Sequence, residues 1–147
     1  MTRSLWPGGL ASATLRPMPQ RSVELILVRQ LAATLAVPML LADAQGDMLF
    51  FNEPAEVLLG QRFDDVGDMP LERRRAIFSF RDEAGQPLTG EPPLMVAITE
   101  RRPVHRRIWL RGFDGEYRAL EATAFPLETA DGRIVGGVVM FWERKNP

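Results

Sequence analysis

Residues 41–60 read LADAQGDMLFFNEPAEVLLG, and this stretch decides the fold. Two short apolar runs, 38–42 and 47–51, flank a turn-forming segment at 43–46 that ends in glycine. Short apolar runs on either side of such a turn are typical of a β-hairpin, because glycine supplies the backbone conformation that a tight reversal needs. The stretch therefore predicts two antiparallel strands.

A helix is predicted directly after the hairpin, over residues 53–59. Asn52 precedes it, and its side chain can accept a hydrogen bond from the free backbone N–H groups at a helix start. Pro54 falls in the first turn, where the missing N–H is not needed, and Gly60 follows as a helix stop.

An amphipathic helix is expected upstream, within residues 21–37. Ser22 can cap its start, and Pro38 limits its end. Apolar residues recur there at every fourth position: Val23, Leu27, Leu31 and Leu35. Residues 1–20 instead contain several prolines and glycines with little periodicity, so we expect a flexible arm.

The segment after the hairpin helix is less regular. Residues 61–90 mix glycine, aspartate, proline and arginine with small apolar clusters, which predicts short helical turns and loops. The string Glu91-Pro92-Pro93 then opens a further helix, whose apolar side we expect to be buried.

Strands dominate the last third of the chain. Residues 104–111 and 117–125 alternate around an Asp-Gly turn, and 134–142 form a long β-branched run that we expect to be the central strand. The pair Gly136-Gly137 within it indicates a close approach or a bulge. With the hairpin, these strands predict an α+β fold: five antiparallel strands with helices on one face of the sheet.

Composition excludes several kinds of chemistry. The chain has 147 residues, no cysteine and a single histidine, His105. Disulfides, thiolate ligands, cysteine nucleophiles and multi-histidine metal sites are therefore excluded, and we expect no metal site. The formal net charge is −1 and no long apolar run occurs. We therefore expect no nucleic-acid partner and no membrane partner, and a cytoplasmic location.

The order of these segments resembles the PAS family over roughly residues 23–143. Residues 41–60 are similar to the family's strand, D-x-x-G turn, strand and N-x-x-A-x-x-L-x-G helix. Residues 107–126 are similar to its strand, D-G turn and proline-ended strand, and residues 131–136 to its final turn and last strand. The resemblance implies a PAS domain over 38–143, followed by a short tail at 144–147.

The resemblance also implies an apolar cavity between the sheet and the middle helices. The candidate lining residues are all apolar: Met39, Leu41, Phe51, Leu58, Phe78, Met95, Ile98, Ile108, Leu110, Leu120 and Phe141. The same residues also fit a filled core, since apolar side chains look alike in sequence whether they contact each other or a ligand. Any ligand is expected to be small and apolar or amphipathic.

Signalling through changes in dimer packing is a further implication of the resemblance. The candidate homodimer interface combines the N-terminal helix with the outward side of the strands: Val23, Leu27, Leu31, Leu35, Trp109, Phe125, Met140 and Trp142. The N-terminal helix can cover that outer face in its own chain or in a second one.

An effector protein, such as a kinase or a transcription regulator, is the other expected partner. The family often continues from its last strand into a signalling helix, and no counterpart follows Glu143. The effector is therefore either bound in trans or cut away.

No cofactor is assigned. A covalent flavin adduct needs a cysteine, which the chain lacks. Haem is not expected, because His105 lies at the start of a strand, whereas haem-binding relatives carry their histidine on the preceding helix.

Charged clusters offer weaker candidates for a site. Residues 72–75, Glu-Arg-Arg-Arg, are interpreted first as an exposed charged face and second as an anion site. The arginines at 101–102 and 106–107 are interpreted first as protection of a sheet edge and second as a contact for an acidic ligand.

Three functions stay open: a ligand-binding regulatory module, a protein–protein adaptor with a filled core, and a small α+β acid–base enzyme. The enzyme needs a carboxylate on the inward face of the sheet. Glu121 lies on a strand in the opposite register from Leu120 and Ala122, which directs it outward. We therefore expect no catalytic residue.

Overall fold

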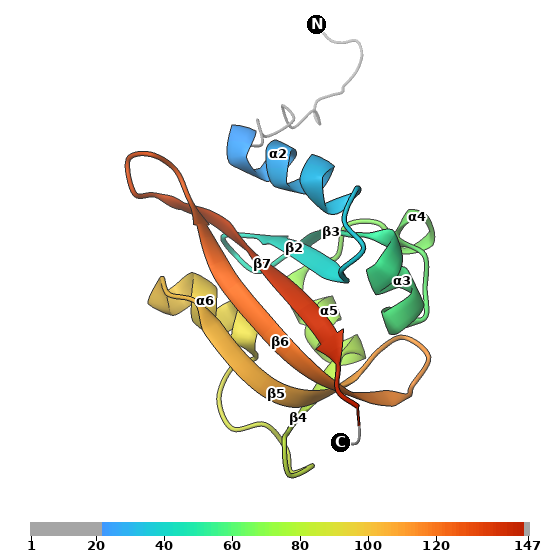
Figure 1. Cartoon of the computed structure of the whole chain (residues 1–147). Coiled ribbons are helices and arrows are strands. Elements are labelled where there is room, and N and C mark those ends of the chain that lie inside the picture. Colours follow the sequence, from blue (N-terminus) through green and yellow to red (C-terminus); the bar gives the residue numbers. More distant parts are fainter. Residues whose placement is uncertain (1–21, 146–147) are drawn as a thin grey trace, which may run out of the picture.

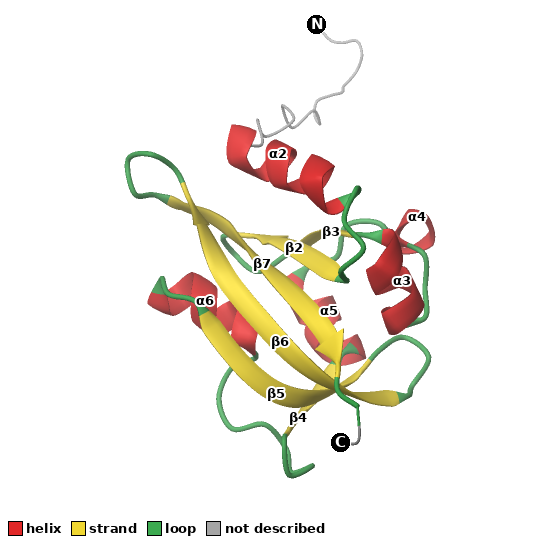
Figure 2. Cartoon of the chain, in the orientation of Figure 1, coloured by secondary structure: helices red, strands yellow, loops and turns green. Residues whose placement is uncertain are grey.

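A computed structural model describes residues 22–145 of the chain. Its centre is an antiparallel sheet with helices on both faces (Figures 1 and 2). The α+β class matches the sequence-based expectation. The arm predicted for residues 1–20 lies outside the described residues.

The sheet has six strands among the described residues, one more than predicted. Their bounds are β2 Met39–Asp43, β3 Met48–Phe51, β4 Ser79–Asp82, β5 Val104–Arg111, β6 Tyr117–Glu128 and β7 Ile134–Glu143. The spatial order is β3-β2-β7-β6-β5-β4, with every neighbouring pair antiparallel. The unpredicted strand is β4, which pairs only with β5 at one edge.

The stretch at 41–60 folds as predicted. Strands β2 and β3 pair as an antiparallel hairpin, and helix α3, Glu53–Leu59, follows. The Asn52 side chain caps this helix by accepting from Ala55 N, and Gly60 ends it with a left-handed φ of 88°. Local capping chemistry thus sets both ends of α3.

Helix α2, Val23–Ala32, covers the outer face of the sheet in its own chain (Figure 1). Ser22 caps it as predicted, but the helix ends several residues before Pro38. Leu25 and Ala32 are buried against the sheet. They belong to an apolar group, here called the outer cluster: Leu25, Ala32, Met39, Leu41, Leu49 and Val138.

The opposite face of the sheet is covered by the other helices, and the main core lies between the two layers. These helices are α3, α4 Phe63–Val66, α5 Leu71–Ile77 and α6 Pro93–Glu100. The predicted loops at 61–90 therefore contain α4, α5 and β4. Helix α6 lies behind β5, β6 and β7 in the view of Figure 1 and contacts all three strands.

Strand β7 lies near the middle of the sheet and makes the predicted close approaches. A Cβ on Gly136 would collide with the backbone oxygen of Ala42 on β2. A Cβ on Gly137 would lie 2.9 Å from Ile98 Cγ1 of α6. Glycine at these two positions lets a neighbouring strand and a helix pack closely against β7.

Candidate functional site

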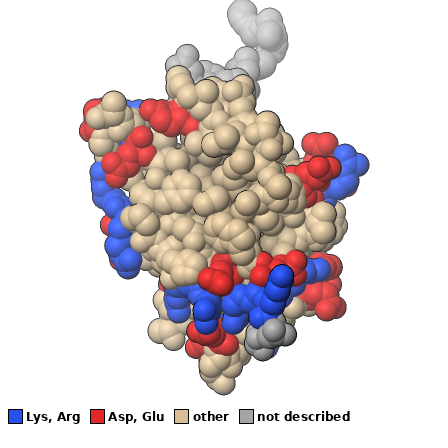
Figure 3. Space-filling model, viewed as in Figure 1, with Lys and Arg blue, Asp and Glu red and all other residues tan. Residues whose placement is uncertain are grey.

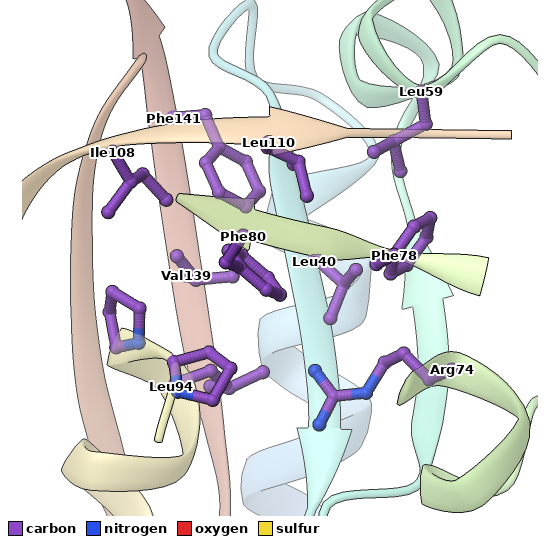
Figure 4. Close-up of a pocket in the computed structure, with 12 residues that line it drawn as sticks. Leu40, Leu59, Arg74, Phe78, Phe80, Leu94, Ile108, Leu110, Val139 and Phe141 are labelled. Carbon is purple, nitrogen blue, oxygen red and sulfur yellow. The ribbon is translucent and has the colours of Figure 1, made fainter. Parts of the chain in front are cut away.

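An apolar cavity lies between the sheet and helices α5 and α6 (Figure 4). Its volume is about 20 Å³, enough for about one water molecule. Its walls come from strands, helices and the segment before α6: Leu40, Leu59, Arg74, Phe78, Phe80, Pro92, Pro93, Leu94, Ile108, Leu110, Val139 and Phe141. Arg74 is the one charged residue among them.

A larger pocket adjoins this cavity and opens toward solvent. Its volume is about 330 Å³, which falls within the usual range for ligand sites, roughly 300–1,000 Å³. The two spaces share four wall residues: Arg74, Phe78, Phe80 and Pro92. The open pocket and the cavity therefore lie on either side of a shared wall, to which Arg74 belongs.

The rim of the open pocket is closed on one side by an ion pair. Arg75 of α5 donates to Glu91, with Nη2 and Oε1 2.7 Å apart. Both side chains are about half exposed, at 52% and 49%. Exposed pairs contribute little stability, so this pair joins α5 to the segment before α6 without locking the entrance.

Local sequence explains why Arg74 points inward. Leu71, Arg74 and Phe78 follow the i, i+3, i+7 spacing of one helix face, and Leu71 and Phe78 both pack in the main core. The start of α5 is fixed by Asp47, whose Oδ1 accepts from Leu71 N at 2.9 Å. The helix therefore cannot turn its arginine outward without also exposing its apolar face.

Arg74 is a buried cation that forms no ion pair within residues 22–145. Its side chain is only 6% exposed, and its Nε has no hydrogen-bond partner among the described residues. Burial lowers the pKa of Arg74 to about 10, with a smaller contribution from Arg75. The carboxylates of Asp47, Glu91 and Asp43 offset part of that shift. The interpretation of residues 72–75 as an exposed face is therefore wrong for Arg74.

The predicted lining residues divide into three groups. Phe78, Ile108, Leu110 and Phe141 line the cavity, and Met95 lines the open pocket. The main core, away from both spaces, takes Phe51, Leu58, Ile98 and Leu120. Met39 and Leu41 were assigned to the wrong face of the sheet, since both lie in the outer cluster under α2. Leu40 and Ala42 occupy the inward positions of β2 instead.

The predicted interface residues also divide. Val23, Leu27 and Leu31 are 66%, 57% and 55% exposed on α2, and Trp142 is 42% exposed. Leu35, Phe125 and Met140 are half-buried and pack on the outer cluster of their own chain. Trp109 is half-buried, and its Nε1 donates to Glu83 O at 3.3 Å.

The outer face in Figure 3 has most of its charges at the margins, and a broad area over the middle of the sheet carries neither sign. Glu121 lies on this face, where its Oε1 is 3.1 Å from His105 Nε2. Both side chains are partly exposed, so Glu121 is not in a cleft between sheet and helices.

Residues 22–145 include no helix long and apolar enough to cross a membrane. Nor do His, Asp or Glu side chains in this part of the chain gather in threes as a metal site requires.

These features define a class of protein: a small α+β domain with an apolar cavity between its sheet and helices and an open pocket beside that cavity. A family model described as the PAS fold matches residues 27–144. The chain belongs to the PAS family, whose members are typically sensory and signal-transduction modules. A search among curated proteins finds no match.

Solved PAS structures share this fold at low sequence identity. The PAS domain of nitrogen regulation protein NR(II) from Vibrio parahaemolyticus has a TM-score of 0.57 at 16% identity, covering 80% of this chain and 98% of that one. A PAS domain from Colwellia psychrerythraea has a TM-score of 0.58 at 14% identity, covering 83% and 99%. The PAS domain of BvgS from Bordetella pertussis has a TM-score of 0.52 at 17% identity, covering 83% and 86%. At these identities the likeness extends to the fold alone.

Proposed function

We propose that this chain is a sensory module that binds a small apolar or amphipathic ligand and signals through a homodimer. The observation that carries the proposal is the closed cavity with its adjoining open pocket of about 330 Å³. The cavity has apolar walls with one charged residue, and the open pocket adds Arg75, Ser79 and Glu91. Apolar walls with a few placed polar groups are typical of small-molecule sites, because burial supplies affinity and the polar groups supply orientation. The expected location stays the cytoplasm, and the expected effector is a separate protein or domain.

Ligand entry has to widen the cavity, because a space of about 20 Å³ holds no ligand larger than water. The wall shared with the open pocket is the place to widen it. Phe80 is only half-buried, and Met95 at the other side of the pocket has a flexible side chain. Movement of the Phe80 side chain would join the spaces without breaking a strand pairing, and Met95 could adjust to an occupant of the open pocket.

Native mass spectrometry of freshly purified protein, alone and after incubation with a metabolite library, tests ligand binding. We expect a mass shift that matches a bound small molecule. A bare polypeptide mass under every condition contradicts a sensor pocket.

A protein–protein adaptor with a filled core is the second candidate. It is favoured by the small volume of the closed cavity, which leaves the core nearly full without a ligand. In that case, the outer face and α2 would do all the binding, and the library would produce no mass shift.

The homodimer is proposed to form through the exposed apolar side of α2. Val23, Ile26, Leu27 and Leu31 are all 47% or more exposed there. They lie on the helix that covers the outer face of the sheet. Burying such a stripe against a second copy would remove apolar surface from water.

Sedimentation of a double variant, Leu27→Glu with Leu31→Glu, tests this interface. We expect a dimer for the unmodified chain and a monomer for the variant, because charges at the centre of an apolar interface are poorly tolerated. Val57→Glu is the matched control, since Val57 is 78% exposed on α3. Dimers of equal stability for all three proteins would remove α2 from the interface.

A further inference from the structure

Arg74 has hydrogen-bond donors that nothing in the described part of the chain uses. Figure 4 shows its guanidinium pointing from α5 into the cavity, toward Leu40 and Leu94. No ion pair of residues 22–145 includes it, and its buried Nε has no acceptor. Nε is the guanidinium nitrogen that is buried without an acceptor, and burying a cation without a partner is destabilising because the hydration it loses is not replaced.

The nearest carboxylates are engaged elsewhere. Asp43 Oδ1 accepts from Gln45 N and Asp47 N, both at 3.0 Å, and Asp47 Oδ1 accepts from Leu71 N at 2.9 Å. Glu91 pairs with Arg75 at the rim. These carboxylates act on Arg74 only through space. Its guanidinium is therefore available to an anion from outside the chain.

We propose that Arg74 binds the carboxylate of an amphipathic ligand whose apolar body lies in the open pocket and the widened cavity. This inference rests on the proposed ligand-binding function and names the class of ligand. The planar guanidinium matches a carboxylate geometrically and can donate two parallel hydrogen bonds to it. The apolar body would contact Phe80, Leu88 and Met95.

Charge balance favours a single carboxylate over a phosphate. One unpaired cation offsets one negative charge. A second negative charge at the same place would be repelled by Asp47 and Glu91, which lie close enough to raise the pKa of Arg74. A neutral apolar molecule would leave the arginine without a partner, which removes the main advantage of binding there.

Matched probes separate the role of charge from that of shape. The probes are benzoate, phenylacetate, hexanoate and octanoate, each paired with its neutral amide, and inorganic phosphate as a separate anion. Binding is measured by calorimetry and by the shift in melting temperature. The proteins are the unmodified chain, Arg74→Met, and Arg73→Met as the control. Arg73 is exposed on the same helix and lines neither space.

We expect at least one carboxylate to bind the unmodified chain and the Arg73 variant, with its amide binding far more weakly. Arg74→Met should weaken that carboxylate by roughly 10- to 150-fold, the range for hydrogen bonds to a charged group. If an acid and its amide bind the unmodified chain equally well, Arg74 does not recognise the carboxylate. The same holds if the acid binds Arg74→Met as tightly as it binds Arg73→Met. Either result would overturn the role of Arg74 but leave the ligand pocket in place. Tighter binding of phosphate than of any carboxylate would also overturn it. No binding by any probe, together with a bare mass in the native spectrum, would overturn the pocket itself.

The unliganded variant supplies a second readout. Methionine has a similar length and no charge, so Arg74→Met should leave the melting temperature of the free protein unchanged or raise it. A purely structural arginine would instead lower it on removal. A large loss of stability in Arg74→Met, with carboxylate binding retained, contradicts the proposal.

Discussion

Asn52 joins three segments of the chain through one buried side chain, which is 1% exposed. Its Oδ1 accepts from Met39 N at 2.9 Å, and also from Ala55 N at the start of α3. Its Nδ2 donates to Ala32 O and Val37 O, at 2.9 and 2.8 Å. The residue that the sequence marks as a helix cap therefore also fixes the end of α2 against β2.

Replacement of Asn52 by alanine should lower the free energy of unfolding by about 3 kcal/mol or more, because four backbone groups lose a hydrogen bond to its side chain and three of these bonds are buried. Urea denaturation measures the effect. Glu53→Gln is the control: this neighbouring side chain is exposed, and its change should stay within about 0.5 kcal/mol. Equal stability of the two variants would mean that water replaces the amide at no cost.

Asp114 and Arg118 form a two-point ion pair at the β5–β6 turn, with contacts of 2.8 and 3.3 Å. The hydrogen bond from Arg118 holds the pKa of Asp114 below its ordinary value, with a second contribution from Glu116 N. A carboxyl whose pKa is lowered by folding stabilises the protein above its unfolded pKa, about 3.9. That stabilisation is lost as the pH falls through the folded value.

Asp114→Asn should therefore lower the free energy of unfolding by about 0.2–1 kcal/mol at neutral pH, as expected for a mostly exposed pair. The difference from the unmodified chain should vanish in acid, once Asp114 is protonated in both states. Urea denaturation at several pH values measures this. Glu116→Gln in the same turn is the control. A difference that is constant with pH would assign the effect to turn geometry and not to charge.

The burial of Arg74 is hard to predict because this residue lies within a run of charged residues. Three successive arginines after Glu72 are typical of a solvated helix face, and two of the three are indeed exposed. The signal that distinguishes Arg74 is its place on the same helix face as Leu71 and Phe78. That spacing predicts burial. The unpaired state could not be predicted, because it depends on which carboxylates the fold brings near.

At the scale of elements, the two glycines of β7 should differ in their tolerance of a methyl group. Gly136→Ala places its Cβ against the backbone oxygen of Ala42, which cannot move without disturbing β2. Gly137→Ala meets the side chains of Ile98 and Leu94, which can adjust. We expect a loss of about 1–3 kcal/mol or more for the first and a smaller loss for the second. Thermal and urea denaturation of both variants compare them. A larger loss at Gly137 would mean that α6 is the more rigid neighbour.

Elements with local signals could be predicted, and elements without them could not. Capping and turn residues set α3, the hairpin and the start of α2, and these agree with the structure. Strand β4 is short and lies at an edge of the sheet. It is a strand only because it pairs with β5, and that long-range pairing leaves no local signal in the sequence. The prediction of which β2 side chains point toward the main core was wrong for a different reason. Both faces of β2 are covered, so its first four residues are all apolar and lack the alternation that reveals register.

At the scale of the whole molecule, dimer formation and folding should be linked. If two copies bind through α2, the native state gains stability with protein concentration, whereas the unfolded state does not. The melting temperature of the unmodified chain should therefore rise across a concentration series. That of the Leu27→Glu, Leu31→Glu variant should stay constant. A constant melting temperature for both proteins contradicts a native dimer.

Because Gly136 and Gly137 have no side chains, only the backbone of β7 separates α2 from α6 at these two positions. Leu25 of α2 touches it from one side, and Ile98 of α6 touches it from the other. An occupant that pushes α6 aside would press on α2 across the thickness of a single peptide unit. A ligand beside α6 and a partner protein bound to α2 would thus both act on the same short backbone segment of β7.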